Sequence, residues 1–182
     1  MSTRELVNSL RPLVERMHRG HCWIKTEEGP RRLGVAFTDF MLAEHCAGRK
    51  AYGLCPVSPG ESTTRVACLD FDSHGGDTDF KTMIKIAEEV KDAAELYGLE
   101  GVAFRSSGGR GVHLIFIWDT PQDAGRVRKL LKRVVNYCGL EPGTKGVAAG
   151  QVEVYPKQDS VPVDGFGSMF ILPLAGESVL LK

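Results

Sequence analysis

The sequence predicts an α+β domain whose larger part has the ferredoxin-like order strand, helix, strand, strand, helix, strand. Two long segments carry apolar residues at helical spacing, at 77–97 and 120–138, and four short segments have the character of strands. In this arrangement the first and third strands are normally central, and the fourth flanks the first. A smaller N-terminal αβ module comes before it.

The N-terminal module, at about residues 1–64, opens with an amphipathic helix. Ser2 and Glu5 form a capping-box pattern, and leucines follow at helical spacing. The turn residues at 58–60 separate the module's last strand from the next one. The elements expected here are, in order, a helix ending before Gly20, a helix at 38–48 and a strand at 51–57.

The larger part, at about residues 65–182, has clear helix boundaries. Gly98 and Gly139 follow the two helices, and Thr120 with Pro121 is a start signal for the second helix. A glycine-rich turn joins the second strand to the third. The elements expected here are, in order, a strand at 65–72, a helix at 77–97, strands at 101–106 and 112–118, a helix at 120–138 and a strand at 151–155.

Length and composition predict one globular domain over residues 1–182. The chain has 182 residues, of which 42% are hydrophobic and 25% are charged. Its formal net charge is zero, so whole-protein charge gives no argument for nucleic-acid binding. Because no run of about 18 apolar residues is present and charges interrupt the N-terminus, neither a membrane span nor a secretory signal is expected. A cytoplasmic protein without a membrane partner is expected.

The cysteines and histidines do not predict a metal site. The five cysteines lack CxxC spacing, so reduced thiols that mostly serve packing are expected. Histidine and cysteine gather in two places, but their spacing matches no common structural zinc motif, and no zinc is expected. The two groups are His18, His21 and Cys22, and His45 and Cys46.

A basic run in the second long helix has two interpretations. Its cations alternate with apolar residues in helical period. The solvated outer face of an amphipathic helix explains this pattern better than a nucleic-acid surface does. The cations are Arg126, Arg128, Lys129, Lys132 and Arg133.

Acidic residues stand on two of the predicted strands. Side chains alternate along a strand, so Asp70 and Asp72 point to one face while Leu69 and Phe71 point to the helices. Glu153 on the fourth strand points the same way, and antiparallel pairing would bring it beside them. Carboxylates so placed suit hard divalent cations. Each motif taken alone is also explained by solvated carboxylates on a half-exposed strand.

The glycine-rich turn at 107–111 is a candidate phosphate site. Its backbone N–H groups, the Ser107 hydroxyl and the Arg110 guanidinium can surround phosphate oxygens, and its glycines permit close approach. His113, just beyond the turn, can donate to a triphosphate. A plain hairpin turn and a structural histidine are the alternatives.

Together these motifs resemble the three signatures of archaeo-eukaryotic primase-polymerase catalytic domains. Asp70-Phe71-Asp72 is similar to the Asp-x-Asp metal motif, residues 107–113 are similar to the Ser-Gly-x-Arg-Gly-x-His nucleotide motif, and Glu153 stands where a third acidic ligand is expected. The likeness is strongest to the bacterial and phage branch that includes CRISPR-associated primase-polymerases and conflict-system primases. It also rests on the stretches 37–39, 47–49, 52–54, 69–74, 153–158, 165–169 and 172–173.

The sequence departs from the family pattern in a few places. Glu153 replaces a frequent aspartate, Ser168 stands where asparagine is expected, and Gly109 lacks the second basic side chain of some relatives. The cysteine-rich zinc knuckle of some relatives is absent from the sequence, which leaves their template-gripping features in question.

The resemblance implies an archaeo-eukaryotic primase fold, in which the N-terminal module packs on a ferredoxin-like or RRM-like palm. It implies a template-directed nucleotidyltransferase, a DNA primase-polymerase, that makes primers or extends chains from nucleoside triphosphates and releases pyrophosphate. Two Mg²⁺ or Mn²⁺ ions would be held by Asp70, Asp72 and Glu153. The expected partners are nucleoside triphosphates, a single-stranded DNA template and primer, and an accessory priming or helicase domain. The implied nucleotide-binding residues are Ser107, Gly108, Arg110, His113, Lys157 and Ser168.

Two other classes fit parts of the pattern. A metal-dependent nuclease or phosphotransferase also uses carboxylates on a sheet, but it does not need a triphosphate pocket. A non-catalytic RNA-binding module of ferredoxin-like fold is the second alternative. Against it, the strands lack stacking aromatic residues, and carboxylates on the sheet face would repel a phosphate backbone.

Overall fold

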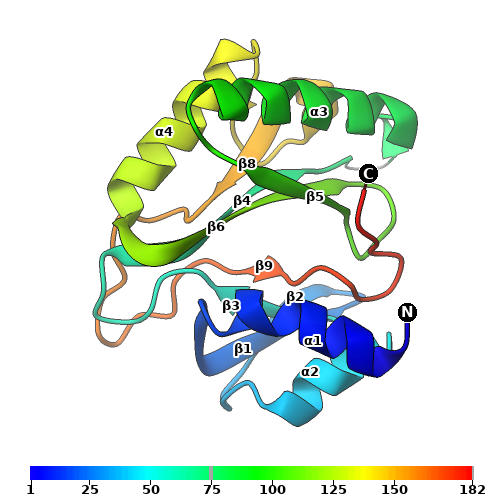
Figure 1. Cartoon of the computed structure of the whole chain (residues 1–182), viewed down its shortest axis with the longest axis vertical. Helices are drawn as coiled ribbons and strands as arrows, with labels where there is room; N and C mark the ends of the chain where they lie inside the picture. The colour runs from blue at the N-terminus through cyan, green and yellow to red at the C-terminus, as the bar shows by residue number, and fades with distance from the viewer. Residues whose placement is uncertain (74–75, 182) are drawn as a thin grey trace.

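The computed structural model describes residues 1–73 and 76–181 and has the predicted α+β architecture. Two layers lie one above the other in Figure 1, with the palm above and the N-terminal module below. The palm elements are β4 (Thr63–Phe71), α3 (Phe80–Leu96), β5 (Gly101–Arg105), β6 (Val112–Asp123), α4 (Ala124–Tyr137), β7 (Glu141–Pro142), the short 3₁₀ helix η2 (Val147–Ala149) and β8 (Gln151–Tyr155). The module elements are α1 (Thr3–Val14), β1 (His18–Thr26), β2 (Gly29–Leu33), α2 (Asp39–Cys46), β3 (Tyr52–Cys55) and β9 (Phe170–Ile171).

The palm sheet has the strand order β5-β6-β4-β8-β7. Its first and third strands in the chain, β4 and β6, are central, and the fourth of the predicted strands, β8, flanks the first. The ferredoxin-like topology predicted from the sequence is therefore confirmed. The two-residue strand β7 adds an unpredicted parallel edge to β8. His74, part of the motif stretch 69–74, lies outside the described residues.

Each face of the palm sheet buries its own set of side chains. On one face Leu69 and Phe71 join a core cluster with residues of α3 and α4, which cover the sheet in Figure 1. On the other face Ile115 and Tyr155 belong to a cluster that includes Phe170 of the module. The sequence predicts the carboxylates on an open face, but the module packs against part of that face because β9 brings Phe170 onto it.

The module contains a hairpin that the sequence did not predict. β1 and β2 pair antiparallel over residues 22–33, and Gly29 takes a φ of 110° at the turn. β9, from residues 170–171, pairs with β3 and completes a sheet of order β2-β1-β3-β9. The module's sheet is therefore not confined to residues 1–64.

The start of α1 agrees with the prediction and its end does not. The Glu5 N–H donates to the Ser2 hydroxyl at 3.3 Å, and the Ser2 N–H donates to the Glu5 carboxylate at 2.6 Å, which completes the capping box. The helix ends at Val14 rather than just before Gly20, because β1 already begins at His18. No helix in the described ranges 1–73 and 76–181 is long and apolar enough to cross a membrane.

The start of α4 also lies later than predicted. Residues 120–121 remain in β6, which continues to Asp123 and pairs there with Thr63. The Asp123 carboxylate then accepts a hydrogen bond from the Arg126 N–H at 2.7 Å and caps the helix. A strand pairing thus overrides the Thr-Pro start signal.

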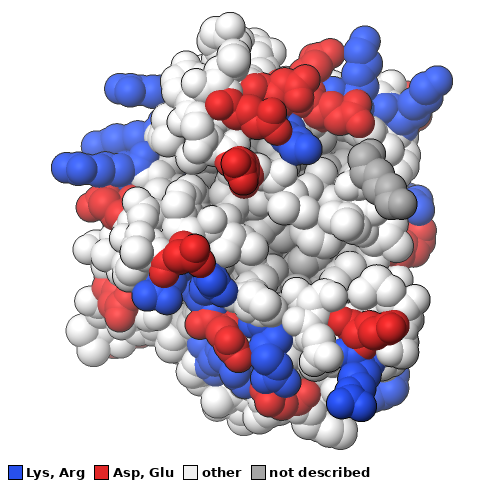
Figure 2. Space-filling model, viewed as in Figure 1, with Lys and Arg blue, Asp and Glu red and all other residues white. Residues whose placement is uncertain are grey.

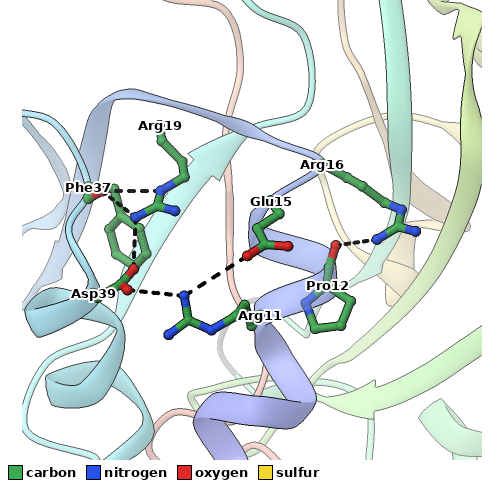
Figure 3. Close-up of polar contacts among 7 residues, drawn as sticks. All are labelled: Arg11, Pro12, Glu15, Arg16, Arg19, Phe37 and Asp39. Atoms are coloured by element: carbon green, nitrogen blue, oxygen red, sulfur yellow. Dashed lines mark hydrogen bonds and ion pairs between the residues drawn. The ribbon is translucent and has the colours of Figure 1, made fainter.

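A polar cluster joins α1, β1 and α2 within the module (Figure 3). The Asp39 carboxylate accepts hydrogen bonds from Arg11 and Arg19, each at 3.0 Å. Arg19 also donates to the backbone carbonyl of Phe37. These contacts fix the start of α2 against the end of α1.

Candidate active site

Three neighbouring strands place three polar side chains in one row across the palm sheet. Asp70 of β4 lies directly opposite His113 of β6 on one side and Glu153 of β8 on the other. Asp72 follows two residues after Asp70, just beyond the end of β4. The juxtaposition predicted from the strand order is therefore present, with Asp70 at its centre.

His113 is a buried partner of Asp70, with 4% of its surface exposed. Its Nε2 lies 3.4 Å from Asp70 Oδ1, and its ring packs edge-on against Phe170 with the centroids 6.3 Å apart. Burial lowers the pKa of His113, but the charge and hydrogen bond of Asp70, with the charge of Asp72, outweigh it and leave the pKa raised. Its Nδ1 is buried and has no hydrogen-bond partner among the described residues. A protonated His113 would thus have one N–H group left for a ligand.

Glu153 is held by two donors from its own strand and the residues after it. Its Oε2 accepts a hydrogen bond from the Tyr155 hydroxyl at 2.8 Å and lies 2.6 Å from Lys157 Nζ. Lys157 Nζ also lies 4.8 Å from the centre of the Tyr155 ring. The burial of Tyr155, and then the charges of Glu153 and Asp70, raise the pKa of its hydroxyl, which keeps it a donor.

Asp72 is held by the backbone at the end of β4. Its Oδ1 accepts a hydrogen bond from the Ser73 N–H at 2.9 Å, and its carbonyl oxygen accepts one from the Val147 N–H at 2.9 Å. The second bond ties the strand end to η2. Local backbone contacts therefore help to fix the position of this carboxylate.

The glycine-rich turn packs directly on the strand that carries the carboxylates. A Cβ atom at Gly111 would lie 2.5 Å from the carbonyl oxygen of Phe71, so only glycine permits this approach. Gly109 has a φ of 75°, in the left-handed region that favours glycine. The Ser106 N–H donates to the Gly111 carbonyl at 2.8 Å, which closes the turn, and Arg110 is exposed at its tip.

Comparison with known proteins assigns the family. Residues 11–181 match the family described as the archaeo-eukaryotic primase domain of the TOTE conflict system. The chain belongs to this family. The primase domain is thus a nucleotidyltransferase of the primase-polymerase type at the level of its family, as the sequence motifs indicated.

The same fold is found in a solved structure. The polymerase domain of Mycobacterium tuberculosis ligase D in complex with DNA superposes with a TM-score of 0.56, covering 94% of the primase domain and 75% of that chain at 16% identity. At this identity the likeness shows the fold alone. No curated protein matches the primase domain at a significant level.

The chemistry of the row fits a divalent cation. Like charges directly opposite each other on a sheet are destabilising, so the Asp70 and Glu153 pair needs positive charge nearby. His113 and Lys157 supply it here. Among residues 1–73 and 76–181, no three His, Cys, Asp or Glu side chains are already grouped as metal ligands. The carboxylates would therefore have to turn toward an ion, and Glu153 would leave Lys157.

Lys25 is a site residue that sequence reasoning missed. It extends from β1 of the module, and its Nζ donates to the Ser107 hydroxyl at 3.0 Å. The same Nζ would lie 3.2 Å from a Cβ atom at Gly108, and its charge lowers the pKa of His113. The module thus adds a cation to the glycine-rich turn. The missing signal was β1 itself, because without that strand nothing placed Lys25 near the palm.

The contacts of Ser168 and Lys157 are with residues outside the glycine-rich turn. The Ser168 N–H and hydroxyl both donate to the Gln158 side-chain oxygen, at 3.2 and 2.8 Å, and this closes the loop between the two residues. Lys157 pairs with Glu153, which stands on the opposite side of Asp70 from His113. Their roles in nucleotide binding stay predictions.

The two histidine and cysteine groups have structural contacts. His18 Nε2 and His21 Nδ1 are 3.1 Å apart, and His21 Nε2 donates to the Phe166 carbonyl at 3.0 Å. The five cysteines are free thiols, and burial raises the pKa of Cys46 to about 11 and that of Cys55 to about 12. Both thiols are therefore protonated near neutral pH.

Proposed function

We propose that this primase domain is a template-directed DNA primase-polymerase that adds nucleotides to a 3′-hydroxyl and releases pyrophosphate. The observation that carries the proposal is the register that sets Asp70 between His113 and Glu153, beside a glycine-rich turn, in a chain of this family. In the reaction the 3′-oxygen forms a bond to the α-phosphorus, the bond to the β-phosphate oxygen breaks, and the hydroxyl proton passes to solvent.

Asp70, Asp72 and Glu153 would hold two Mg²⁺ or Mn²⁺ ions. Such ions, when bound, supply charge stabilisation for the attacking and leaving oxygens. The donor set supports this assignment, because it consists of carboxylate oxygens, which are the ligands that hard cations prefer. Asp70 and Glu153 are each partly shielded from solvent, with side chains 22% and 17% exposed.

The glycine-rich turn would bind the triphosphate. Ser107, Gly108 and Arg110 offer a hydroxyl, a backbone approach and a guanidinium, and Lys25 adds an ammonium group. His113 would donate a hydrogen bond from its unpartnered Nδ1–H to a phosphate oxygen, while its Nε2–H continues to face the Asp70 carboxylate. Catalysis by these residues consists of positioning and of neutralising charge.

Primer extension tests the proposal directly. The primase domain is incubated with a 5′-labelled primer on a longer DNA template, nucleoside triphosphates and Mn²⁺. The expected result is elongated primer and released pyrophosphate, both abolished by a chelator. Shortened primer without pyrophosphate would instead identify a nuclease, and strand binding without either product would identify a non-catalytic nucleic-acid module.

His113 has its own test within the same assay. His113→Gln removes the imidazolium but keeps a donor, so the KM for the nucleoside triphosphate should rise while binding of Mn²⁺ changes little. An unchanged KM would remove His113 from the triphosphate site. An accessory priming or helicase domain and a cytoplasmic location stay predictions.

A further inference from the structure

A pocket of about 160 Å³ lies beside Glu153 at the outer edge of the palm sheet. β7 stops at Pro142, opposite Val152, and the pocket opens where β8 continues beyond it. Its walls come from α4, from residues 142–144 and from the end of β8. Glu153 therefore belongs both to the carboxylate row and to this pocket.

Cations dominate the polar lining of the pocket. Arg128 and Lys132 are one turn apart on α4, and both are half-buried, whereas Lys129 on the same helix is exposed. The interpretation of the whole basic run as a solvated helix face is therefore wrong for Arg128 and Lys132. Lys157 is the third cation of the lining.

The pocket has more positive charge than its neighbours neutralise. Arg128 Nη2 lies 2.7 Å from Asp159 Oδ1, and Lys157 Nζ lies 2.6 Å from Glu153. Lys132 has no ion pair or hydrogen bond within the described part of the chain. Three cations thus face two carboxylates, so the pocket suits an anion.

The order of strands fixes what this anion would be. Across the sheet the row runs from His113 through Asp70 to Glu153 and then to the pocket, and the glycine-rich turn lies at the strand ends, where it leads into β6 just before His113. In phosphoryl transfer the attacking and leaving oxygens lie roughly in line on opposite sides of the phosphorus. If the triphosphate occupies the turn, as the proposed function states, the strand that carries the attacking 3′-hydroxyl must approach from the side of Glu153.

We propose that Arg128, Lys132 and Lys157 form a phosphate subsite for the acceptor of the reaction, and this inference rests on the proposed function. The ligand is a phosphate group, either a backbone phosphodiester of the strand being extended or the phosphates of a free nucleotide that serves as the first acceptor. Binding draws Lys157 toward the phosphate and away from Glu153, which frees that carboxylate to turn toward a cation.

Lys132→Gln is the most direct test, because Lys132 has no carboxylate partner that the change would leave unpaired. The matched control is Lys129→Gln, on the exposed side of α4. Lys132→Gln should raise the KM for primer–template about three- to tenfold and reduce the slope of log affinity against log salt by about 0.7 to 0.9, the value of one phosphate contact. The KM for the nucleoside triphosphate and the control variant should stay unchanged.

Strand binding measured without catalysis separates failure of this inference from failure of the proposed function. Fluorescence anisotropy of a labelled single strand should show the same weakening for Lys132→Gln even if no extension is observed, in which case the subsite stands and the polymerase assignment falls. Active enzyme in which Lys132→Gln equals Lys129→Gln in strand binding, in primer extension and in the joining of two free nucleotides would overturn the subsite.

Two reactions distinguish the source of the phosphate. A defect of Lys132→Gln in primer extension identifies the phosphodiester of a strand. A defect confined to the joining of two free nucleotides on a template identifies the phosphates of a first nucleotide. A rise in the KM for the incoming triphosphate alone would contradict the proposal, because it would move the pocket to the leaving-group side.

Discussion

The palm and the N-terminal module each bury a histidine, and they use it in opposite ways. In the palm, His113 faces Asp70, and the net effect of that carboxylate is a raised pKa. In the module, His45 Nε2–H donates to the Pro173 carbonyl at 2.8 Å, and its Nδ1 accepts from the Tyr52 N–H at 3.0 Å. Burial there lowers the pKa of His45 to about 4.

The difference teaches that the surroundings of a buried histidine, and not its residue type, decide whether it keeps a nitrogen free to contact a ligand. Both ring nitrogens of His45 are satisfied by backbone groups, so this side chain has nothing left to offer a ligand. His113 keeps one nitrogen without a partner among the described residues. Unused hydrogen-bonding capacity next to carboxylates supports the proposal that substrate binds at the palm.

The space-filling view agrees with a local rather than a global role for charge. Acidic and basic side chains are intermixed over both layers on the face that Figure 2 shows. The formal net charge of the chain is zero. Substrate binding would therefore depend on particular groups such as Lys25 and Lys132.

The largest effect is expected from Asp70→Asn, which removes the charge of the carboxylate that faces His113 in the palm. The change removes a cation ligand and the counter-charge of His113 together, so incorporation should fall at least about 10³-fold, a loss of ~4 kcal/mol in transition-state stabilisation. Primer extension under single-turnover conditions measures it. Asp72→Asn should behave similarly.

Asp39→Asn is the matched control for the loss of one carboxylate. Asp39 also pairs with cations, but it lies in the module cluster of Figure 3. Its variant should extend primers like the parent. Asp70→Asn with normal extension, or with unfolding as its main effect in a thermal melt, would remove Asp70 from the catalytic site.

The next largest effect is expected when His45 is protonated, and the quantity affected is the free energy of unfolding. Below a pH of about 6.5 the unfolded chain binds a proton on His45, while the folded chain does so only near its pKa of about 4. The free energy of unfolding should therefore decrease as the pH falls across this window, by up to about 3 kcal/mol. Chemical denaturation of the parent and of His45→Gln at pH 8, 6 and 4.5 measures the difference.

The variant separates this histidine from other acid-sensitive groups. His45→Gln should be less stable than the parent at pH 8, because it replaces two well-placed backbone contacts, but its stability should depend less on pH. Equal pH dependence in both proteins would show that His45 does not titrate between the folded and unfolded states as inferred.

The palm could be predicted from the sequence because its signals are local. The alternation around Asp70, the periodicity of 77–97 and the glycine-rich turn each specify one element, and the topology rules for such units then set the strand order. That order predicts that Asp70, His113 and Glu153 lie side by side, and the strand register confirms this placement.

The module could not be predicted equally well because its sheet depends on distant partners. β1 begins shortly after α1 and carries few strand-forming residues in alternation, so it was missed, and Lys25 was missed with it. β9 consists of two residues that become a strand only by pairing with β3. The pocket beside Glu153 likewise needs the edge formed by β7, a two-residue strand without a sequence signal.

Lys25→Met tests a place where a charged side chain of the module reaches the palm site. Loss of the ammonium group next to Ser107 should raise the KM for the nucleoside triphosphate about tenfold, which corresponds to ~1.4 kcal/mol, with little change in kcat. Steady-state extension at saturating primer–template measures it. Lys85→Met, on the exposed surface of α3, is the control. Equal KM values for the two variants would confine the triphosphate site to the palm.

The smallest effect is expected from Asp39→Asn on stability, which tests whether polar contacts in the module are structural only. Its carboxylate is 59% exposed, so its two ion pairs are screened by water and salt. The hydrogen bonds from Arg11 and then Arg19 lower the pKa of Asp39, so its contribution is present above the ordinary pKa of aspartate and is lost as the pH falls through the lowered value. The melting temperature should drop slightly at pH 7 and low salt, and the drop should vanish in 1 M salt. A drop that persists in high salt would mean that Asp39 acts through the geometry of its hydrogen bonds to Arg11 and Arg19 rather than through its charge.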